Sequence, residues 1–316
     1  MSRSPIDPTL LEAVLTPTPG RARTLPAEAY TSQAVFDWET EHLFEGGWVC
    51  VGRAPDLAEP GDQRAFRIGS EGILVVRDLA GAIRGFYNTC RHRGHELLEP
   101  GTSRNLRAIR CPYHAWVYRL DGALGAAPRF GDVAGFDRAD HPLVAARVQE
   151  WEGWIFVNAD GGAPALEDHL GNLCELVRPS EPSRLVVTES HEHVIQADWK
   201  TITERYHGCS HGPAVLSVGL FPNLLLSLHP DSVMTHRIQP LGPARCQVEC
   251  QWLVSSEAAE RPGFSPASAC EFWVTDREDR LENESVHTFT ATVARAYVDG
   301  RASEPPLVHE PDPAGA

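Results

Sequence analysis

Two Cys-His pairs in the first half of the chain constrain its fold more than any other feature. The first pair is Cys90-Arg-His92, and the second, after eighteen intervening residues, is Cys111-Pro-Tyr-His114. Each pair offers one thiolate and one imidazole from a separate loop. A [2Fe-2S] cluster with two thiolates on one iron and two imidazoles on the other needs this set of donors. A structural zinc site of two cysteines and two histidines is the alternative, and chance placement is a weaker one.

Length and charge narrow the classes of protein further. The chain has 316 residues, of which 42% are hydrophobic, so it can form two domains with real cores. Its formal net charge of -15 repels phosphate backbones and anionic membrane surfaces. We therefore expect no nucleic-acid or membrane partner, and a cationic substrate or a basic redox partner would suit the chain better.

The N-terminus and the cysteine content indicate the compartment. The first residues, Met-Ser-Arg-Ser-Pro-Ile-Asp, lack the apolar region of a secretory signal, and no later apolar stretch is long enough to span a bilayer. Eight cysteines without a signal peptide favour reduced thiols and metal ligation over a disulfide framework. The sequence thus predicts a cytoplasmic protein.

The pattern of the first half predicts an arm, a helix and a β domain. Residues 1–30 are rich in Pro, Thr and Ala without periodicity, which is typical of an extended or disordered arm. Residues 35–44 follow helical spacing up to a Gly-Gly stop. Short β-rich runs separated by turn signals fill residues 48–158. These predicted strands include residues 72–77, 83–87, 117–120 and 153–158.

The second half mixes helices and strands. Leu166, Leu170, Leu173 and Val177 fall on one helix face before Pro179. Residues 184–196, 232–241 and 245–254 predict strands of a larger antiparallel sheet, with helical segments at 199–211 and 270–297. The predicted fold class is α+β, with a small all-β domain followed by an antiparallel-sheet domain.

A second candidate metal site lies in Glu204-Arg-Tyr-His207-Gly-Cys-Ser-His211. On a helix, positions 204, 207 and 211 share one face. Two histidines with one carboxylate form the set that leaves coordination positions open on ferrous iron. The alternative is a pair of ordinary histidines on a helix face.

Other reactive side chains have structural interpretations. His191 and His193 alternate with Glu192 along a predicted strand, which favours a solvated strand face. Cys246 and Cys250 share one strand face and are interpreted as core residues. A bystander role is favoured for Cys209.

The two Cys-His loops resemble those of a known family. Cys90-Arg-His-Arg-Gly-His and Cys111-Pro-Tyr-His-Ala-Trp are similar to the cluster loops of Rieske ring-hydroxylating oxygenase α subunits. Thr24-Leu-Pro-Ala, Gly47-Trp-Val-Cys-Val-Gly, Pro60-Gly-Asp and Trp151-Glu-Gly-Trp-Ile-Phe-Val-Asn resemble the choline monooxygenase and betaine or carnitine oxygenase branch. The resemblance spans most of residues 24–211, with a weaker match at 271–298.

The resemblance implies domains and ligands. It implies a Rieske [2Fe-2S] domain at 48–160, a helix-grip-like catalytic domain at 161–316, and an N-terminal arm and helix at 1–47 that packs on the catalytic domain. Cys90 and Cys111 would bind one iron of the cluster, and His92 and His114 the other. His207, His211 and Asp279 would bind a mononuclear iron, with Asp276 and Glu278 as alternative carboxylates, and Glu204 would link cluster to iron.

Some positions depart from the family pattern. Three residues rather than four separate His207 from His211, and the helix before Glu204 is about one turn shorter. Only 67 residues separate His211 from Asp279, and Ala115 replaces the usual glycine. A Rieske oxygenase-like protein with an altered or disabled iron site, acting in electron transfer only, is therefore the alternative function.

The resemblance also implies an activity and partners. The implied activity is that of a mono- or dioxygenase. The implied partner is a ferredoxin or flavin reductase that draws on NADH or NADPH, and the implied assembly is a homotrimer with electron transfer between subunits. A quaternary amine is the favoured substrate and an aromatic compound the second, and Trp252, Phe272 and Trp273 could contact a cation. A stand-alone Rieske ferredoxin would not need the residues after 160, and a zinc-stapled binding module is the other alternative.

Overall fold

The computed structural model describes residues 4–16, 24–131, 133–209, 215–261, 284–302 and 305–309. It divides into two compact units. We name Phe44–Ala163 the β unit, and Met1–Leu43 with Pro164–Ala316 the mixed unit.

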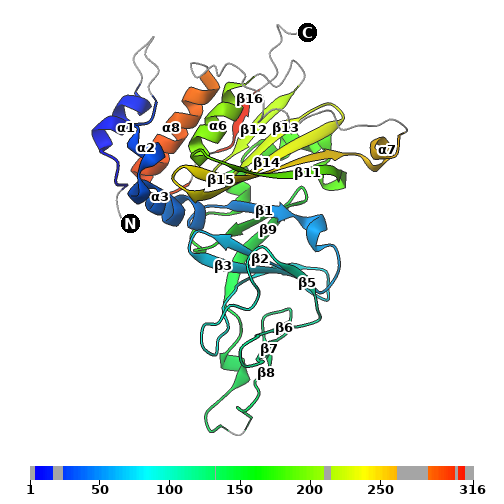
Figure 1. Cartoon of the computed structure of the whole chain (residues 1–316). Coiled ribbons are helices and arrows are strands. Elements are labelled where there is room, and N and C mark those ends of the chain that lie inside the picture. Colours follow the sequence, from blue (N-terminus) through cyan, green and yellow to red (C-terminus); the bar gives the residue numbers. More distant parts are fainter. Residues whose placement is uncertain are drawn as a thin grey trace. The chain divides into compact units, whose positions relative to one another are not determined.

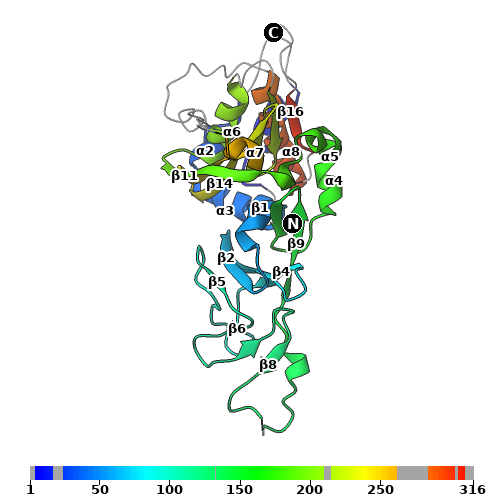
Figure 2. The same cartoon turned by 90° about the vertical axis from the view of Figure 1, so that its right-hand side faces the viewer.

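The β unit is built from two antiparallel sheets. The larger has the order β1-β10-β9-β4-β3-β2-β5 and the smaller the order β6-β7-β8. The strands are β1 (Val49–Arg53), β2 (Asp62–Ile68), β3 (Glu71–Arg77), β4 (Ile83–Tyr87), β5 (Ser103–Asn105), β6 (Ile109–Arg110), β7 (Val117–Tyr118), β8 (Leu124–Ala126), β9 (Ala145–Trp151) and β10 (Trp154–Asn158). Two 3-10 turns, Ala54–Leu57 and Arg138–Asp140, complete the unit. Figure 2 shows β6 and β8 at the end of this unit remote from β1.

The hairpin of β3 and β4 shows why these residues form strands. Ile73 to Val76 are fully buried, and the two strands pair from Ile73 with Tyr87 to Arg77 with Ile83. Asp78 accepts hydrogen bonds from the N–H groups of Ala80 and Ala82, both at 2.9 Å, which fixes the turn. The predicted strands at 72–77 and 83–87 are therefore confirmed.

The mixed unit contains one antiparallel sheet with the order β11-β15-β14-β13-β12-β16. Its strands are β11 (Val186–Ile195), β12 (Leu216–Leu220), β13 (Leu224–Leu228), β14 (Ser232–Gly242), β15 (Arg245–Val254) and β16 (Leu307–His309). The sequence predicted β11, β14 and β15, which form one edge of the sheet. It did not predict β12, β13 and β16, which form the other edge.

The helices of the mixed unit are α1 (Pro8–Leu15), α2 (Glu28–Thr31), α3 (Gln33–Glu39), α4 (Leu166–Leu170), α5 (Leu173–Val177), α6 (Trp199–Gly208), α7 (Ser256–Ala259) and α8 (Glu284–Asp299). A π-helical turn, Thr40–Glu45, follows α3, and 3-10 turns occupy Arg178–Ser180 and Pro182–Arg184. Helix α8 packs against both α1 and α6, and α6 contacts β12 and β14 (Figure 1). Within the described residues, no helix is long and apolar enough to cross a membrane.

Two predictions about helices were wrong. Residues 1–30 do not form only an extended arm, because α1 lies within them. Asp7 caps this helix by accepting the Thr9 N–H at 2.9 Å, and Leu11 and Val14 are buried. The single helix predicted before Pro179 is two short helices, because Gly171 adopts φ +54° between them.

Candidate metal centres

The first Cys-His loop, after β4, is a tight turn closed by its own backbone. The Cys90 N–H donates to the His95 carbonyl at 2.8 Å, and the Gly94 N–H donates to the Cys90 carbonyl at 2.9 Å. Gly94 has φ +70°, a conformation that glycine adopts without a steric penalty. The turn buries the thiol of Cys90, which is 2% exposed.

The second loop, between β6 and β7, repeats the same turn. The Cys111 N–H donates to the Trp116 carbonyl at 2.8 Å, and the Ala115 N–H donates to the Cys111 carbonyl at 3.2 Å. Ala115 has φ +59° and stands where the first loop has Gly94. A left-handed conformation costs a residue with a Cβ about 1–2 kcal/mol, so this loop keeps the turn at some cost.

The two loops bring the four predicted donors together. The rings of His92 and His114 lie with their centroids 4.7 Å apart at an interplanar angle of 71°. Burial raises the pKa of the Cys90 thiol, and the neighbouring Cys111 adds to the rise. Burial, and then the ring of His114, lowers the pKa of His92, which favours the neutral imidazole that binds metal.

An unsatisfied polar atom tests whether these residues fit a cluster. Among the described residues, the buried Nδ1 of His92 has no hydrogen-bond partner. Buried polar atoms without a partner are rare, and an ion that the structure does not hold is one explanation. Trp116 stacks on the His92 ring at 4.8 Å and is 1% exposed, so it shields this side of the loops. By contrast, Tyr113 is 59% exposed. The donor set fits a [2Fe-2S] cluster.

Tyr118 connects the two loops through a sulfur contact. Its hydroxyl lies 3.2 Å from Cys90 Sγ and accepts a hydrogen bond from the Arg91 N–H at 3.0 Å. Because the hydroxyl accepts from Arg91, its own proton is available to Cys90 Sγ. Burial raises the pKa of Tyr118, which keeps that proton in place.

The second candidate site begins on α6, which Asp198 caps by accepting the Lys200 N–H at 2.9 Å. Lys200, Glu204 and His207 fall on one helix face, and all three side chains are buried. A Cβ atom at Gly219 on β12 would lie 2.6 Å from Nε2 of His207, so only glycine admits this ring beside the strand. Positions 204 and 207 share a helix face as predicted, but the predicted helix at 199–211 is too long, because α6 ends at Gly208 and Cys209 is extended. His211 lies outside the described residues.

Lys200 is the centre of a buried polar network. Its Nζ lies 2.6 Å from Glu39 Oε1 and 2.8 Å from Asp198 Oδ1. Glu39 also accepts the Trp199 indole N–H at 2.9 Å and the hydroxyl of Tyr297. The network ties α3, α6 and α8 together on the helix face that also carries Glu204.

Glu204 is held by a residue from the N-terminal segment. The Tyr30 hydroxyl donates to Glu204 Oε1 at 2.5 Å. Burial raises the pKa of Glu204 to about 7, although the hydrogen bond from Tyr30 and the charge of Lys200 oppose the rise. A carboxyl group with this pKa can take up or release a proton near neutrality.

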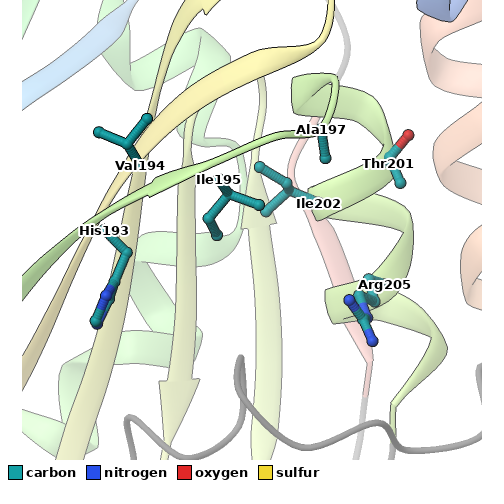
Figure 3. Close-up of a pocket in the computed structure, with 7 residues that line it drawn as sticks. All are labelled: His193, Val194, Ile195, Ala197, Thr201, Ile202 and Arg205. Carbon is teal, nitrogen blue, oxygen red and sulfur yellow. The ribbon is translucent and has the colours of Figure 1, made fainter.

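The opposite face of α6 borders a groove of about 270 Å³ between the helix and the end of β11 (Figure 3). Its lining residues are His193, Val194, Ile195, Ala197, Thr201, Ile202 and Arg205. His193 lines this groove and, like His191, is partly exposed, so the predicted solvated strand face holds in part. The groove does not include Glu204 or His207. A separate cavity of about 10 Å³, with room for about one water, adjoins His207.

Several predicted site residues lie outside the described residues. These are His211, Asp279, the alternatives Asp276 and Glu278, and the aromatic residues Phe272 and Trp273. Within the described part of the chain, no group of three His, Cys, Asp or Glu side chains could hold a metal ion. In a two-iron cluster of the predicted type, each iron binds only two protein donors, so a group of three is not needed there.

Two family models match the chain. A Rieske [2Fe-2S] domain matches residues 47–137, and the catalytic domain of the ring-hydroxylating α subunit matches residues 214–294. The chain therefore combines a Rieske [2Fe-2S] domain with the catalytic domain of a ring-hydroxylating α subunit. The first match supports an iron-sulfur cluster in the β unit, and the second supports an iron in the mixed unit.

Curated relatives of the chain fall in the predicted branch. It is 37% identical over 204 residues to the carnitine monooxygenase oxygenase subunit of Acinetobacter pittii (strain PHEA-2), covering 62% of this chain and 53% of the relative. It is 34% identical over 206 residues to the glycine betaine monooxygenase oxygenase subunit of Chromohalobacter salexigens, covering 65% and 44%. The chain thus spans about half the length of the carnitine monooxygenase subunits that it matches.

Solved structures confirm the predicted fold class. The quaternary ammonium Rieske monooxygenase CntA in complex with L-carnitine aligns with a TM-score of 0.74 at 23% identity, covering 94% of this chain and 100% of that chain. Naphthalene 1,2-dioxygenase from Rhodococcus sp. aligns with a TM-score of 0.71 at 20% identity, covering 95% and 88%. Both likenesses concern the fold alone.

We expect Tyr118→Phe to lower the reduction potential of the Rieske cluster. Loss of the hydrogen bond to Cys90 Sγ removes a stabilisation that favours the reduced, more negative cluster, a change on the order of 50 mV. A redox titration followed by EPR measures it. Tyr113→Phe is the matched control, because Tyr113 is 59% exposed and contacts the His114 ring at 3.9 Å. Equal potentials in all three proteins would contradict the assigned role.

We expect Glu204 to make the mixed unit less stable as the pH rises. Its folded pKa of about 7 lies above the ordinary value of 4.5, so the unfolded chain loses its proton first. Stability is lost between pH 4.5 and about 7 and is constant above, with a total of roughly 3 kcal/mol. Urea unfolding across this range should show a flatter curve for Glu204→Gln. The exposed Glu192→Gln is the control, and parallel curves for Glu204→Gln and the unsubstituted chain would refute the expectation.

Proposed function

We propose that this chain is the oxygenase component of a multicomponent Rieske oxygenase. It would use electrons from NADH or NADPH to reduce O2 and to hydroxylate or N-demethylate a small organic substrate. One observation carries the proposal, namely that two matching loops bring Cys90, Cys111, His92 and His114 together in the β unit. The match to a ring-hydroxylating catalytic domain supports the oxygenase part.

The roles of the ligands follow from the donor sets. Cys90 and Cys111 would hold one iron of the cluster, and His92 and His114 the other. His207, His211 and Asp279 would hold the mononuclear iron, with Asp276 and Glu278 as the other candidates for the carboxylate. When bound, the cluster supplies single electrons and the mononuclear iron supplies the place where dioxygen is reduced.

The residues around these ligands position them and handle protons. Trp116 shields His92 from water, and Tyr118 directs a proton toward Cys90 Sγ. In the mixed unit, Tyr30 fixes the carboxyl of Glu204 one helical turn before His207. With a pKa of about 7, Glu204 can hold or release a proton at Oε1 or Oε2 under working conditions.

Partners and assembly belong to the same proposal. We propose a ferredoxin or flavin reductase as electron donor, and a homotrimer in which Glu204 bridges His92 or His114 of one subunit to His207 of another. A solved quaternary ammonium Rieske monooxygenase is described as giving insight into inter-subunit electron transfer, which supports this arrangement. The predicted cytoplasmic location stays a prediction.

A quaternary amine is the proposed substrate class. Relatives that are 34% to 37% identical act on carnitine or glycine betaine by their names. The formal net charge of -15 also favours a cationic ligand over an anionic one. An aromatic compound is the second class, in line with the fold shared with naphthalene 1,2-dioxygenase.

The test has two stages. Full-length protein reconstituted without oxygen should show the visible and EPR spectra of a Rieske cluster, with two irons and two sulfides for the cluster on analysis. With ferrous iron, a reductase and NADH, methylated amines should stimulate oxygen uptake more than aromatics. A pale protein that binds zinc would overturn the proposal. A cluster signal without turnover on any substrate would instead favour the electron-transfer alternative.

A further inference from the structure

A second histidine lies beside His207, on the edge strand β16 of the sheet. His309 is the last residue of β16, which pairs with β12 in the register of Ser217 with His309 and Gly219 with Leu307. The rings of His207 and His309 lie with their centroids 5.0 Å apart at an interplanar angle of 76°. Two residues that are 102 positions apart in the sequence thus present imidazoles to one small volume.

The local structure is shaped around this pair. Gly219, which pairs with Leu307, leaves the space that the His207 ring occupies, because a Cβ there would lie 2.8 Å from Cε1 of the ring. Phe289 of α8 covers the His207 ring at 5.9 Å. The pairing of β12 with β16 therefore does two things. It places His309, and it aligns Gly219, which leaves room for the His207 ring.

The orientation of His309 is set by a hydrogen bond on one ring nitrogen. Nδ1 lies 2.9 Å from Oγ of Ser285, at the start of α8. Nε2, the other nitrogen, is buried and has no hydrogen-bond partner among the described residues. Histidines that bind metals typically have one nitrogen held by a partner of this kind, which fixes the ring and leaves the other nitrogen for the ion.

We propose that His309, through Nε2, is a nitrogen ligand of the metal ion that His207 binds. The inference rests on the proposed function, because it takes His207 to be an iron ligand. Imidazole nitrogens suit divalent iron and cobalt alike. In this assignment β16 supplies a metal ligand, although it lies outside the sequence motif that contains Glu204 and His207.

Cobalt(II) binding tests this assignment without relying on turnover. Full-length protein with its cluster intact and oxidised is stripped of mononuclear metal, and cobalt(II) affinity is measured by calorimetry. The EPR signal of high-spin cobalt reports its ligands. We expect His309→Ala to weaken binding by about 100-fold or more, and Ser285→Ala by about 10-fold. His309→Gln is the second variant, since it keeps a polar side chain of similar reach if alanine disturbs folding.

The controls separate this inference from the proposed function. His191→Ala removes an imidazole that is hydrogen-bonded to Glu189 at 2.6 Å on β11, and it should leave cobalt affinity unchanged. If His207→Ala abolishes binding while the His309 variants bind normally, the role of His309 is refuted and the proposed iron site stands. If His207→Ala also binds cobalt normally, the proposed iron site fails.

Discussion

Replacing His92 by alanine should eliminate the Rieske EPR signal and lower substrate-dependent oxygen uptake by at least about 100-fold. The expected loss is large because one iron of the proposed cluster has only two protein donors, and this substitution removes one of them. That iron keeps His114 as its one protein donor, and the stacked pair of His92 and Trp116 that shields this side of the loops is lost as well. Iron and sulfide content, EPR and oxygen uptake measure the three consequences together.

His95→Ala is the matched control for this experiment. His95 lies in the same loop, three residues further on, and is exposed, and its backbone carbonyl rather than its ring supports the turn. Its replacement should leave the cluster signal and the oxygen uptake within about twofold of the unsubstituted values. A normal cluster in His92→Ala, or loss of the cluster in both variants, would contradict the ligand assignment.

The fold was predictable where apolar residues follow the spacing of a strand or helix and turn residues mark its end. Strand β3 is a run of apolar residues followed by an Asp-Leu-Ala-Gly turn, so the sequence indicates a hairpin directly. Strands β12 and β13 are different, since Leu224 to Leu228 are all buried and show no alternation. Strand β16 covers only Leu307–His309 and pairs with residues about 90 positions earlier, which no local pattern reveals.

The candidate cluster could be located from sequence because all four donors stand on two short loops with turn residues beside them. Their geometry adds what spacing cannot give. The positive φ of Ala115 matches that of Gly94 and shows that both loops use one turn. Tyr118 contacts Cys90 from 28 residues away, and its strand position gave no sign of this role.

The surroundings of Glu204 were not predictable in the same way. Tyr30 lies in a segment that reads as an arm, and Glu39 lies in a helix whose pattern suggests only an apolar stripe. Both reach α6 across more than 150 residues of sequence. The signal that could have been noticed is Glu39, an acidic residue among the apolar residues on the buried face of its helix. A carboxylate is almost never buried without a partner, so this position indicates a buried cation or hydrogen-bond donor nearby.

The largest expected effect on stability comes from removing Lys200, the cation that pairs with the buried carboxyl groups of Glu39 and Asp198. Lys200→Met should destabilise the mixed unit by about 3–5 kcal/mol, because it leaves the carboxyl groups of Glu39 and Asp198 buried without their cation. Lys200 is 0% exposed and contacts both groups within 2.8 Å. Burial already raises the pKa of Asp198 to about 6 despite Lys200. Urea unfolding at pH 8 measures the loss.

The dependence of this defect on pH identifies its cause. As the pH falls from 8 to 5, the carboxyl group of Asp198, whose pKa burial raises to about 6, takes up a proton in the folded variant and the burial penalty declines. The free-energy difference between Lys200→Met and the unsubstituted chain should therefore shrink, and Glu39→Gln added to the variant should restore part of the stability at pH 8. Arg184→Met, which breaks an exposed pair with Glu181, should cost less than about 1 kcal/mol. A defect in Lys200→Met that is equal at both pH values would show that lost packing, and not an unpaired buried charge, is responsible.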